Sequence, residues 1–259
     1  MSSNSARIRQ LSHQFQTELS TTVNDTLGRE DALTNSLLRA TETRVSLTTN
    51  RPIELFIDGE HQLNLLITYW LSLSSDSQFL AVDTSSFKVL TLEENDQFGP
   101  IVTFDYMRQP RSSDVPTSHL NLHTQNDSTL RALALSGSSR RAKNRRRKAA
   151  KSFDKGRSVR SPHGAEGDIH IPLGGARFRP CLEDVLEMLI VEFGVDHNKN
   201  SWKRTLSEGR KRWRKHQLLA AVKDNPTTAA ERLRELGYDV AWNGPGEEPK
   251  TRVEKLERF

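Results

Sequence analysis

The stretch RVSLTTNRPIELFIDGEHQLNLLITYWLSL, residues 44–73, decides the fold of this chain. β-Branched and aromatic residues recur in short runs, and turn-forming residues separate these runs at 50–52 and 58–59. The pattern predicts three strands, at 44–48, 53–58 and 62–73. Because the connections are only a few residues long, the strands pair antiparallel, since parallel pairing needs a long crossover.

More strands are predicted beyond this stretch. Apolar and aromatic runs predict them at 79–82, 87–92 and 101–107. Two later segments, SHLNLH at 118–123 and DIHIP at 168–172, alternate polar and apolar residues, which is typical of a strand with one buried face. The sequence therefore predicts an α+β fold with a central antiparallel sheet of about seven strands.

Helices are predicted on both sides of the sheet region in the sequence. Upstream, the spacing of Ile8, Leu11, Phe15 and Leu19 predicts one amphipathic helix, and a second helix is predicted at 31–44. Pro180 and Gly194 suit the two ends of a third helix, and Thr228 forms a capping box with Glu231 at the start of another. The C-terminal region is thus predicted to hold three helices and an edge strand, at 180–194, 202–223, 228–237 and 238–240.

The chain divides into three predicted regions. They are an N-terminal helical segment at 1–44, an α+β domain at 45–242 and a polar tail at 243–259. Within the α+β domain, residues 137–160 are predicted to form a disordered basic insert, because they lack the apolar residues that packing requires.

The positive charge of the chain is concentrated in this insert. It holds 11 Lys+Arg against 1 Asp+Glu, whereas residues 1–136 hold 10 against 16 and residues 161–259 hold 17 against 16. Clustered cations bind polyanions by releasing counterions. We predict nucleic-acid contacts by six residues of the insert and of the helix at 202–223: Arg145, Arg146, Arg147, Lys148, Arg210 and Arg214. The alternative is a solvated loop and a solvated helix face balanced by the acidic N-terminal part.

A second basic feature precedes the helix at 180–194. The turn Gly174–Gly175, followed by Arg177 and Arg179, can present backbone amides and guanidinium groups to a phosphate. No phosphate-binding glycine fingerprint accompanies this turn, so it predicts a phosphate site only weakly.

Composition and motifs exclude several classes of site. The single cysteine, Cys181, excludes an internal disulfide and any zinc site built on several thiolates. No P-loop, dinucleotide fingerprint, G-x-S-x-G elbow or HExxH motif is present, so no cofactor and no metal are predicted. The N-terminus lacks a signal-like apolar run, and the most apolar stretch, 63–73, is about half a membrane span. A cytoplasmic location without a membrane partner is therefore predicted.

Histidines provide the candidate catalytic site. His119 and His123 are four residues apart on a predicted strand, which separates them by about 13 Å, too far to share a metal ion. If the strand of His170 pairs with theirs, two imidazoles lie about 5 Å apart. Asp105 and Arg108 add a carboxylate and a cation. These groups are what metal-independent transesterification of a phosphodiester requires. The alternative is a set of hydrogen-bonded polar residues on a sheet face.

Two resemblances accompany these residues. The run LGGARFRPCLEDVLEMLI at 173–190, with WRKHQ at 213–217, resembles a widespread group of uncharacterised bacterial proteins without an established activity. FDYMR at 104–108 followed by HLNLH at 119–123 more loosely resembles TumE-type toxins of toxin–antitoxin pairs. The second resemblance implies an aromatic and acidic strand followed by a histidine-bearing strand.

The function predicted from the sequence is that of an intracellular nucleic-acid-associated protein with a toxin-like, metal-independent ribonuclease site. The alternative is a non-catalytic interaction or regulatory partner that binds another protein. RNA, DNA and protein all remain open as partners. A catalytic site would bring His119, His170 and Arg108 together in a concave pocket, whereas an interaction protein would present them apart.

Overall fold

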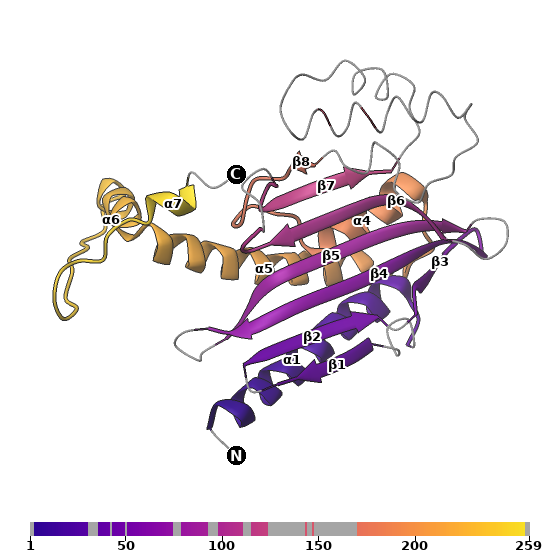
Figure 1. Ribbon diagram of the computed structural model, residues 1–259, viewed down its shortest axis with the longest axis horizontal. Coiled ribbons are helices and arrows are strands. Elements are labelled where there is room, and N and C mark those ends of the chain that lie inside the picture. Colours follow the sequence, from indigo (N-terminus) through magenta and orange to yellow (C-terminus); the bar gives the residue numbers. More distant parts are fainter. Residues whose placement is uncertain are drawn as a thin grey trace.

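A twisted antiparallel sheet with helices on one face forms the body of the computed structural model (Figure 1). The structure describes residues 3–30, 36–41, 43–49, 51–74, 79–92, 98–110, 115–123, 143, 147 and 170–256. Eight strands make one sheet in the order β1-β2-β4-β5-β6-β7-β8, with β3 also paired to β4. The predicted α+β fold with a central antiparallel sheet is confirmed.

The strands follow the alternation seen in the sequence. Their bounds are β1 Ser36–Ala40, β2 Arg44–Thr49, β3 Ile53–Ile57, β4 Glu60–Leu73, β5 Leu80–Leu92, β6 Phe98–Met107, β7 Ser118–Leu122 and β8 Ile171–Pro172. β2 and β3 lie one after the other along the same edge of β4, pairing with its second and first halves. Pro52 stands between them, where its missing N–H does not interrupt a ladder.

Three helices pack against one face of the sheet: α1 Ser3–Leu27, α4 Leu182–Phe193 and α5 Trp202–Asp224. The first confirms the amphipathic helix predicted from residues 8–19, since Ile8 and Leu19 are buried. The core between the layers is formed by aliphatic side chains of both, among them Leu47, Leu65, Ile67, Val89, Leu186, Leu189 and Leu206. The ladder β4–β5–β6 therefore carries its apolar face toward the helices and its other face away from them.

The ends of α4 explain where this helix begins and stops. Cys181 is the N-cap residue, and its N–H donates to the Asp184 carboxylate at 3.0 Å. The helix therefore begins at Leu182, two residues after the predicted start at Pro180. Gly194 adopts φ 71° and ends the helix as predicted, because a left-handed residue is what the C-terminal cap requires.

Two predictions upstream are wrong in their element type or bounds. The helix predicted at 31–44 is contradicted by β1, which pairs along β2; Thr41 closes the connecting turn by accepting the Arg44 N–H at 3.0 Å. The strands predicted at 79–82 and 87–92 form one strand, β5. The polar residues at 83–86 do not form a turn, because β5 stays paired with β4 on both sides of them. Asp83 also accepts a hydrogen bond from Ser72 on β4.

Differences also occur after α5. Helix α6 Pro226–Glu235 begins two residues before the predicted Thr228, because proline is well suited to the first helical turn. Residues 238–240 form no strand, and a short helix, α7 Val253–Leu256, lies in the predicted polar tail. α6 and α7 lie beyond the end of the sheet and do not cover it (Figure 1).

Candidate functional site

A cluster of polar side chains lies where β6, β7 and residue 170 meet. The ladder places Asp105 opposite His119, and His119 Nε2 is 3.8 Å from Asp105 Oδ2. Asn121 Nδ2 donates to the same carboxylate oxygen at 3.0 Å. The rings of His119 and His170 meet edge to face, with centroids 4.4 Å apart. The structure thus brings together His119, His170 and Asp105 of the predicted catalytic set.

The burial of His119 determines what this cluster can do. His119 is 2% exposed, and its Nδ1 lies 2.9 Å from the Pro116 carbonyl oxygen. A carbonyl oxygen only accepts, so Nδ1 carries the hydrogen and donates it. The other ring nitrogen faces Asp105. Both ring nitrogens of His119 are therefore directed at protein groups, as in a hydrogen-bonded polar core. A general base must reach a proton of the substrate, and His119 does not meet this requirement as it lies here.

Arg108 and His123 lie away from this cluster. Arg108 follows the end of β6, and its contacts are with β5. Its guanidinium lies 3.2 Å from Asp83 Oδ1 and donates to the Val82 carbonyl oxygen at 3.0 Å. His123 Nε2 lies 3.1 Å from Thr103 Oγ1. The cation that transesterification requires is thus paired with β5 and is not part of the histidine cluster.

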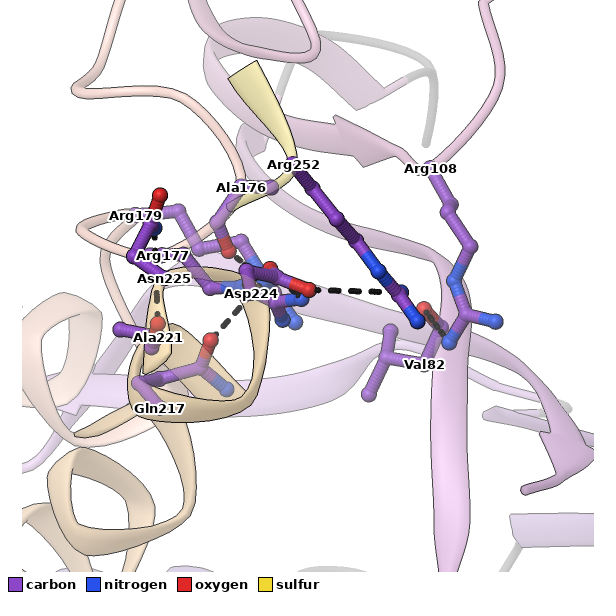
Figure 2. Close-up of polar contacts among 10 residues, drawn as sticks. All are labelled: Val82, Arg108, Ala176, Arg177, Arg179, Gln217, Ala221, Asp224, Asn225 and Arg252. Atoms are coloured by element: carbon purple, nitrogen blue, oxygen red, sulfur yellow. Dashed lines mark hydrogen bonds and ion pairs between the residues drawn. The ribbon is translucent and has the colours of Figure 1, made fainter. Parts of the chain in front are cut away.

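The helix-covered face carries a second polar site, which we call the arginine cluster (Figure 2). Its centre is Asp224, 3% exposed, at the C-terminal end of α5. Arg177 Nε and Nη2 both donate to Asp224 Oδ2, at 2.9 and 2.5 Å. Arg252 Nη1 lies 3.6 Å from the other oxygen, and the Arg252 N–H donates to the Asp224 carbonyl oxygen at 2.8 Å. One buried carboxylate thus joins the segment before α4 to the segment before α7.

Arg179 is the most buried arginine of the cluster. It is 7% exposed, with its guanidinium carbon 3.6 Å from the centre of the Tyr106 ring and 4.8 Å from that of Trp213. It also donates to the Ala176 carbonyl oxygen and, at 3.4 Å, to Gln217 Oε1. Burial lowers the pKa of Arg179 to about 10. This cation therefore links the sheet to α5 from within and does not face a ligand.

Cys181 and Asp184 form a hydrogen-bonded pair at the N-terminal end of α4. Burial raises the pKa of the Cys181 thiol above its usual range, so Cys181 stays protonated and donates to Asp184 at 3.2 Å. Burial alone would raise the pKa of Asp184, but hydrogen bonds from Cys181 and Arg210 outweigh it and lower that pKa. The thiol is unreactive, as its low exposure and raised pKa require.

Helix α5 presents most of its positive residues to solvent. Arg204, Lys211, Arg212 and Lys215 are exposed and fall within about 100° of one another around the helix axis. We call these four residues the basic face. The opposite side of α5 is packed, with Leu206 and Gly209 buried. A Cβ at Gly209 would collide with the side chain of Glu183 on α4, so a larger residue there would require that side chain to move.

The two residues of α5 predicted to bind nucleic acid have internal partners. Arg210 donates to Asp184 Oδ1 at 2.7 Å and to Glu187. Burial alone would lower the pKa of Arg210, but these hydrogen bonds raise it. Arg214 is 68% exposed and lies 3.5 Å from Asp184 Oδ1. The charge of Arg210 is thus neutralised within the fold, and that of Arg214 is shared.

The insert at 137–160 lies almost entirely outside the described residues. Arg145, Arg146 and Lys148 are among the residues that the structure does not describe, as is Asp168 of the predicted strand. Lys143 and Arg147 are helical and exposed. The predicted contacts of the insert with nucleic acid therefore stay predictions.

Two cavities lie away from both polar sites. One of about 280 Å³ is lined by the end of α1 and Arg29 after it, by β3 and Gly59, and by Asp196 after α4. Another, of about 430 Å³, lies along α1. Across the described ranges, no group of three His, Cys, Asp or Glu side chains is placed to hold a metal ion. None of the helices in the same ranges combines the length and apolar character needed to cross a membrane.

No protein family model, no curated protein and no solved structure matches this chain. Its function is accordingly inferred from the arrangement of its own residues.

Sequence reasoning missed Asp224 and Arg252. A signal was present, because an aspartate in the last turn of a helix is opposed by the helix dipole and usually has a compensating partner. That partner, Arg177, lies 47 residues away in sequence. The phosphate-site interpretation of Arg177 and Arg179 also missed that both guanidinium groups are engaged within the fold.

Proposed function

We propose that this protein binds nucleic acid through the basic face of α5. The observation that carries the proposal is the placement of Arg204, Lys211, Arg212 and Lys215 on one solvent-exposed side of a helix. Glu208, the only exposed acidic residue of that helix, lies within the same side, four residues from Arg204 and from Arg212, so the side has three positive charges more than it has negative ones. The four cations span about 16 Å along the helix axis at 1.5 Å per residue. Duplex DNA carries one negative charge per about 1.7 Å, so this length faces several phosphates.

The packing of α5 favours a phosphate-binding role. Its apolar side contacts α4 and α1, so the basic face is held on a fixed helix rather than on a loop. Binding then requires ordering of the four long side chains but not of the backbone, which lowers the entropic cost of association.

The same surface favours binding without sequence discrimination. Many single-strand binders contact the bases by stacking them on exposed aromatic rings. The aromatic residues of α5, Trp202 and Trp213, lie on its packed side, and Trp213 contacts Arg179. Contacts to phosphates alone fix position but carry no sequence information. We therefore expect similar affinities for unrelated sequences of the same length and strandedness.

A ribonuclease site at the histidine pair is the second candidate. It is favoured by the 4.4 Å separation of the His119 and His170 rings beside Asp105. The burial of His119 and the pairing of Arg108 with Asp83, outside the histidine cluster, speak against it. For this reason the proposal is confined to binding, and cleavage is treated as a separate experimental question.

Neutralising the basic face is the experiment that tests the proposal. In the variant with Arg204, Lys211, Arg212 and Lys215 replaced by glutamine, we expect affinity for a 20–30-nucleotide duplex or single strand to fall about 100-fold or more at low salt, because each lost phosphate contact removes released counterions. Fluorescence anisotropy with labelled RNA and DNA measures the change. The four side chains are exposed, so folding should be retained.

A matched control has the same loss of charge elsewhere. Arg9, Arg39, Arg44 and Arg51 are exposed arginines of α1, β1, β2 and the following turn. Their replacement by glutamine should weaken binding only by the general loss of positive charge, by less than about tenfold at physiological salt, where screening limits the reach of distant charges. Equal losses in the two variants would contradict a binding site on α5.

Replacement of His119 by alanine distinguishes the two candidates. We expect the free energy of unfolding of the His119→Ala variant to be about 1–3 kcal/mol lower than that of the parent. Asp105 loses a polar neighbour in this variant, and the Pro116 carbonyl loses its hydrogen-bond donor. Nucleic-acid affinity should not change. Chemical denaturation and anisotropy measure the two quantities. Metal-independent RNA cleavage by the parent that is lost in both His119→Ala and His170→Ala, with folding retained, would instead establish the ribonuclease.

A further inference from the structure

The end of the molecule beyond the sheet carries an unusual share of exposed apolar residues. We define the helical arm as residues 218–256, which contain the last two turns of α5, all of α6 and all of α7. In Figure 1 α6 and α7 lie at the far end of α5, away from the sheet. Within the described residues, nine of the sixteen exposed large apolar side chains belong to the arm: Leu218, Leu219, Val222, Leu233, Leu236, Tyr238, Trp242, Val253 and Leu256.

The arm is folded but has almost no core of its own. Helix α6 is 10 residues long and has no buried residue. Isolated helices shorter than about 12–15 residues are marginal in water, and most helices gain stability by packing an apolar face. Polar contacts shape the arm instead, including the hydrogen bonds from Arg234 Nε to the Val240 carbonyl and from Trp242 Nε1 to the Gly246 carbonyl. An ordered segment with exposed apolar side chains is typical of a protein interface.

The charge of the arm separates it from the basic face of α5. Residues 202–217 hold seven Lys+Arg against one Asp+Glu, whereas the arm holds six against seven. A near-neutral surface does not attract a polyanion. It also meets a second near-neutral surface without like-charge repulsion. The apolar side chains at the end of α5 therefore fit a partner surface that is apolar and close to neutral.

We propose that the helical arm docks onto the arm of a second copy of this chain, forming a two-fold symmetric dimer. A two-fold contact uses the same patch on both copies, so one near-neutral apolar surface serves as its own complement. Stable interfaces involve about 20–30 residues a side, which the 39 residues of the arm can supply. Because the arm extends away from the sheet, two arms can meet without a collision between the two sheets.

The dimer would place two basic faces in one particle. If the proposed nucleic-acid function holds, the second face binds a long nucleic acid at a raised effective concentration, so the dimer should bind long strands more tightly than the monomer does. This consequence rests on the proposed function, but the dimer itself does not.

The mass of the full chain in solution tests the inference. For the parent, sedimentation velocity should give a particle of twice the 29.4 kDa chain mass. Leu218 and Leu219 are 64% and 58% exposed, so their replacement by glutamate spares the fold but places charge in the contact. We expect Leu218→Glu/Leu219→Glu to weaken dimerisation at least 100-fold. Val191→Glu on α4, at a residue 62% exposed, is the control and should leave the dimer intact.

The possible outcomes separate this inference from the proposed function. A parent that stays monomeric at the highest concentration reached, or a double glutamate variant that dimerises like the parent, overturns the dimer. The basic-face variant with four glutamines should remain a dimer while losing nucleic-acid affinity. If it remains a dimer and binds nucleic acid as the parent does, the proposed function fails while the dimer stands.

Discussion

Replacement of Asp224 by alanine is expected to lower the free energy of unfolding by about 3–5 kcal/mol, because it removes the carboxylate from a buried ion pair and leaves Arg177 without its partner. The side chain of Asp224 is 4% exposed, so water cannot replace its hydrogen bonds. Arg252 loses its ion-pair partner at the same time. Urea denaturation of the parent and the variant measures the loss.

A double-mutant cycle separates this pair from general damage to α5. Arg177→Met alone should also destabilise, since it leaves the buried Asp224 charge with only the more distant Arg252. If the pair acts as a unit, the double variant Arg177→Met/Asp224→Ala should be markedly more stable than the sum of the two single losses predicts. Additive losses would show that the two side chains do not interact as the structure describes.

Replacement of Arg179 by alanine is expected to cost about 2–4 kcal/mol, because the side chain fills the space between Tyr106 and Trp213 and its loss leaves a cavity. Replacement by methionine should cost much less. The methionine stem fills the same space, and the burial of a charge is avoided.

The size of that burial cost follows from the pKa. Burial lowers the pKa of Arg179 from its ordinary value to about 10, which corresponds to about 3 kcal/mol at neutral pH. Because the folded-state pKa is the lower one, the penalty is present in full below about pH 10 and fades as the pH rises from there toward the ordinary pKa of arginine. Thermal unfolding of Arg179→Ala and Arg179→Met at pH 7 tests this. Equal losses in both would mean that the guanidinium itself, and not its volume, holds the sheet to α5.

Local patterns were sufficient to predict most of the sheet. The alternation around Val45 and Leu47 correctly placed β2, since both side chains are buried. Gly194 correctly marked the end of α4, because the cap conformation is a local property of glycine. Short connections were enough to predict antiparallel pairing. In each case the structure depends on interactions among residues that are close together in the sequence, so a local sequence pattern is enough to predict it.

Non-local pairing accounts for what could not be predicted. The segment at 36–40 has apolar spacing compatible with a helix, and its pairing with β2 makes it a strand. The histidine pair could be predicted from strand alternation, but not its burial, which depends on what covers the sheet face. The contact of Arg179 with Trp213 joins residues that no local pattern relates.

The central claim is that the basic face of α5 binds the phosphates of nucleic acid, and the salt dependence of binding tests it most directly. The logarithm of the binding constant falls with the logarithm of salt concentration, with a slope of about 0.7–0.9 per phosphate contacted. Relative to the parent, the variant with Arg204, Lys211, Arg212 and Lys215 replaced by glutamine should have a slope shallower by about 2.8–3.6. The Arg9, Arg39, Arg44 and Arg51 control should keep the parent slope. Parallel lines for all three proteins would contradict the claim.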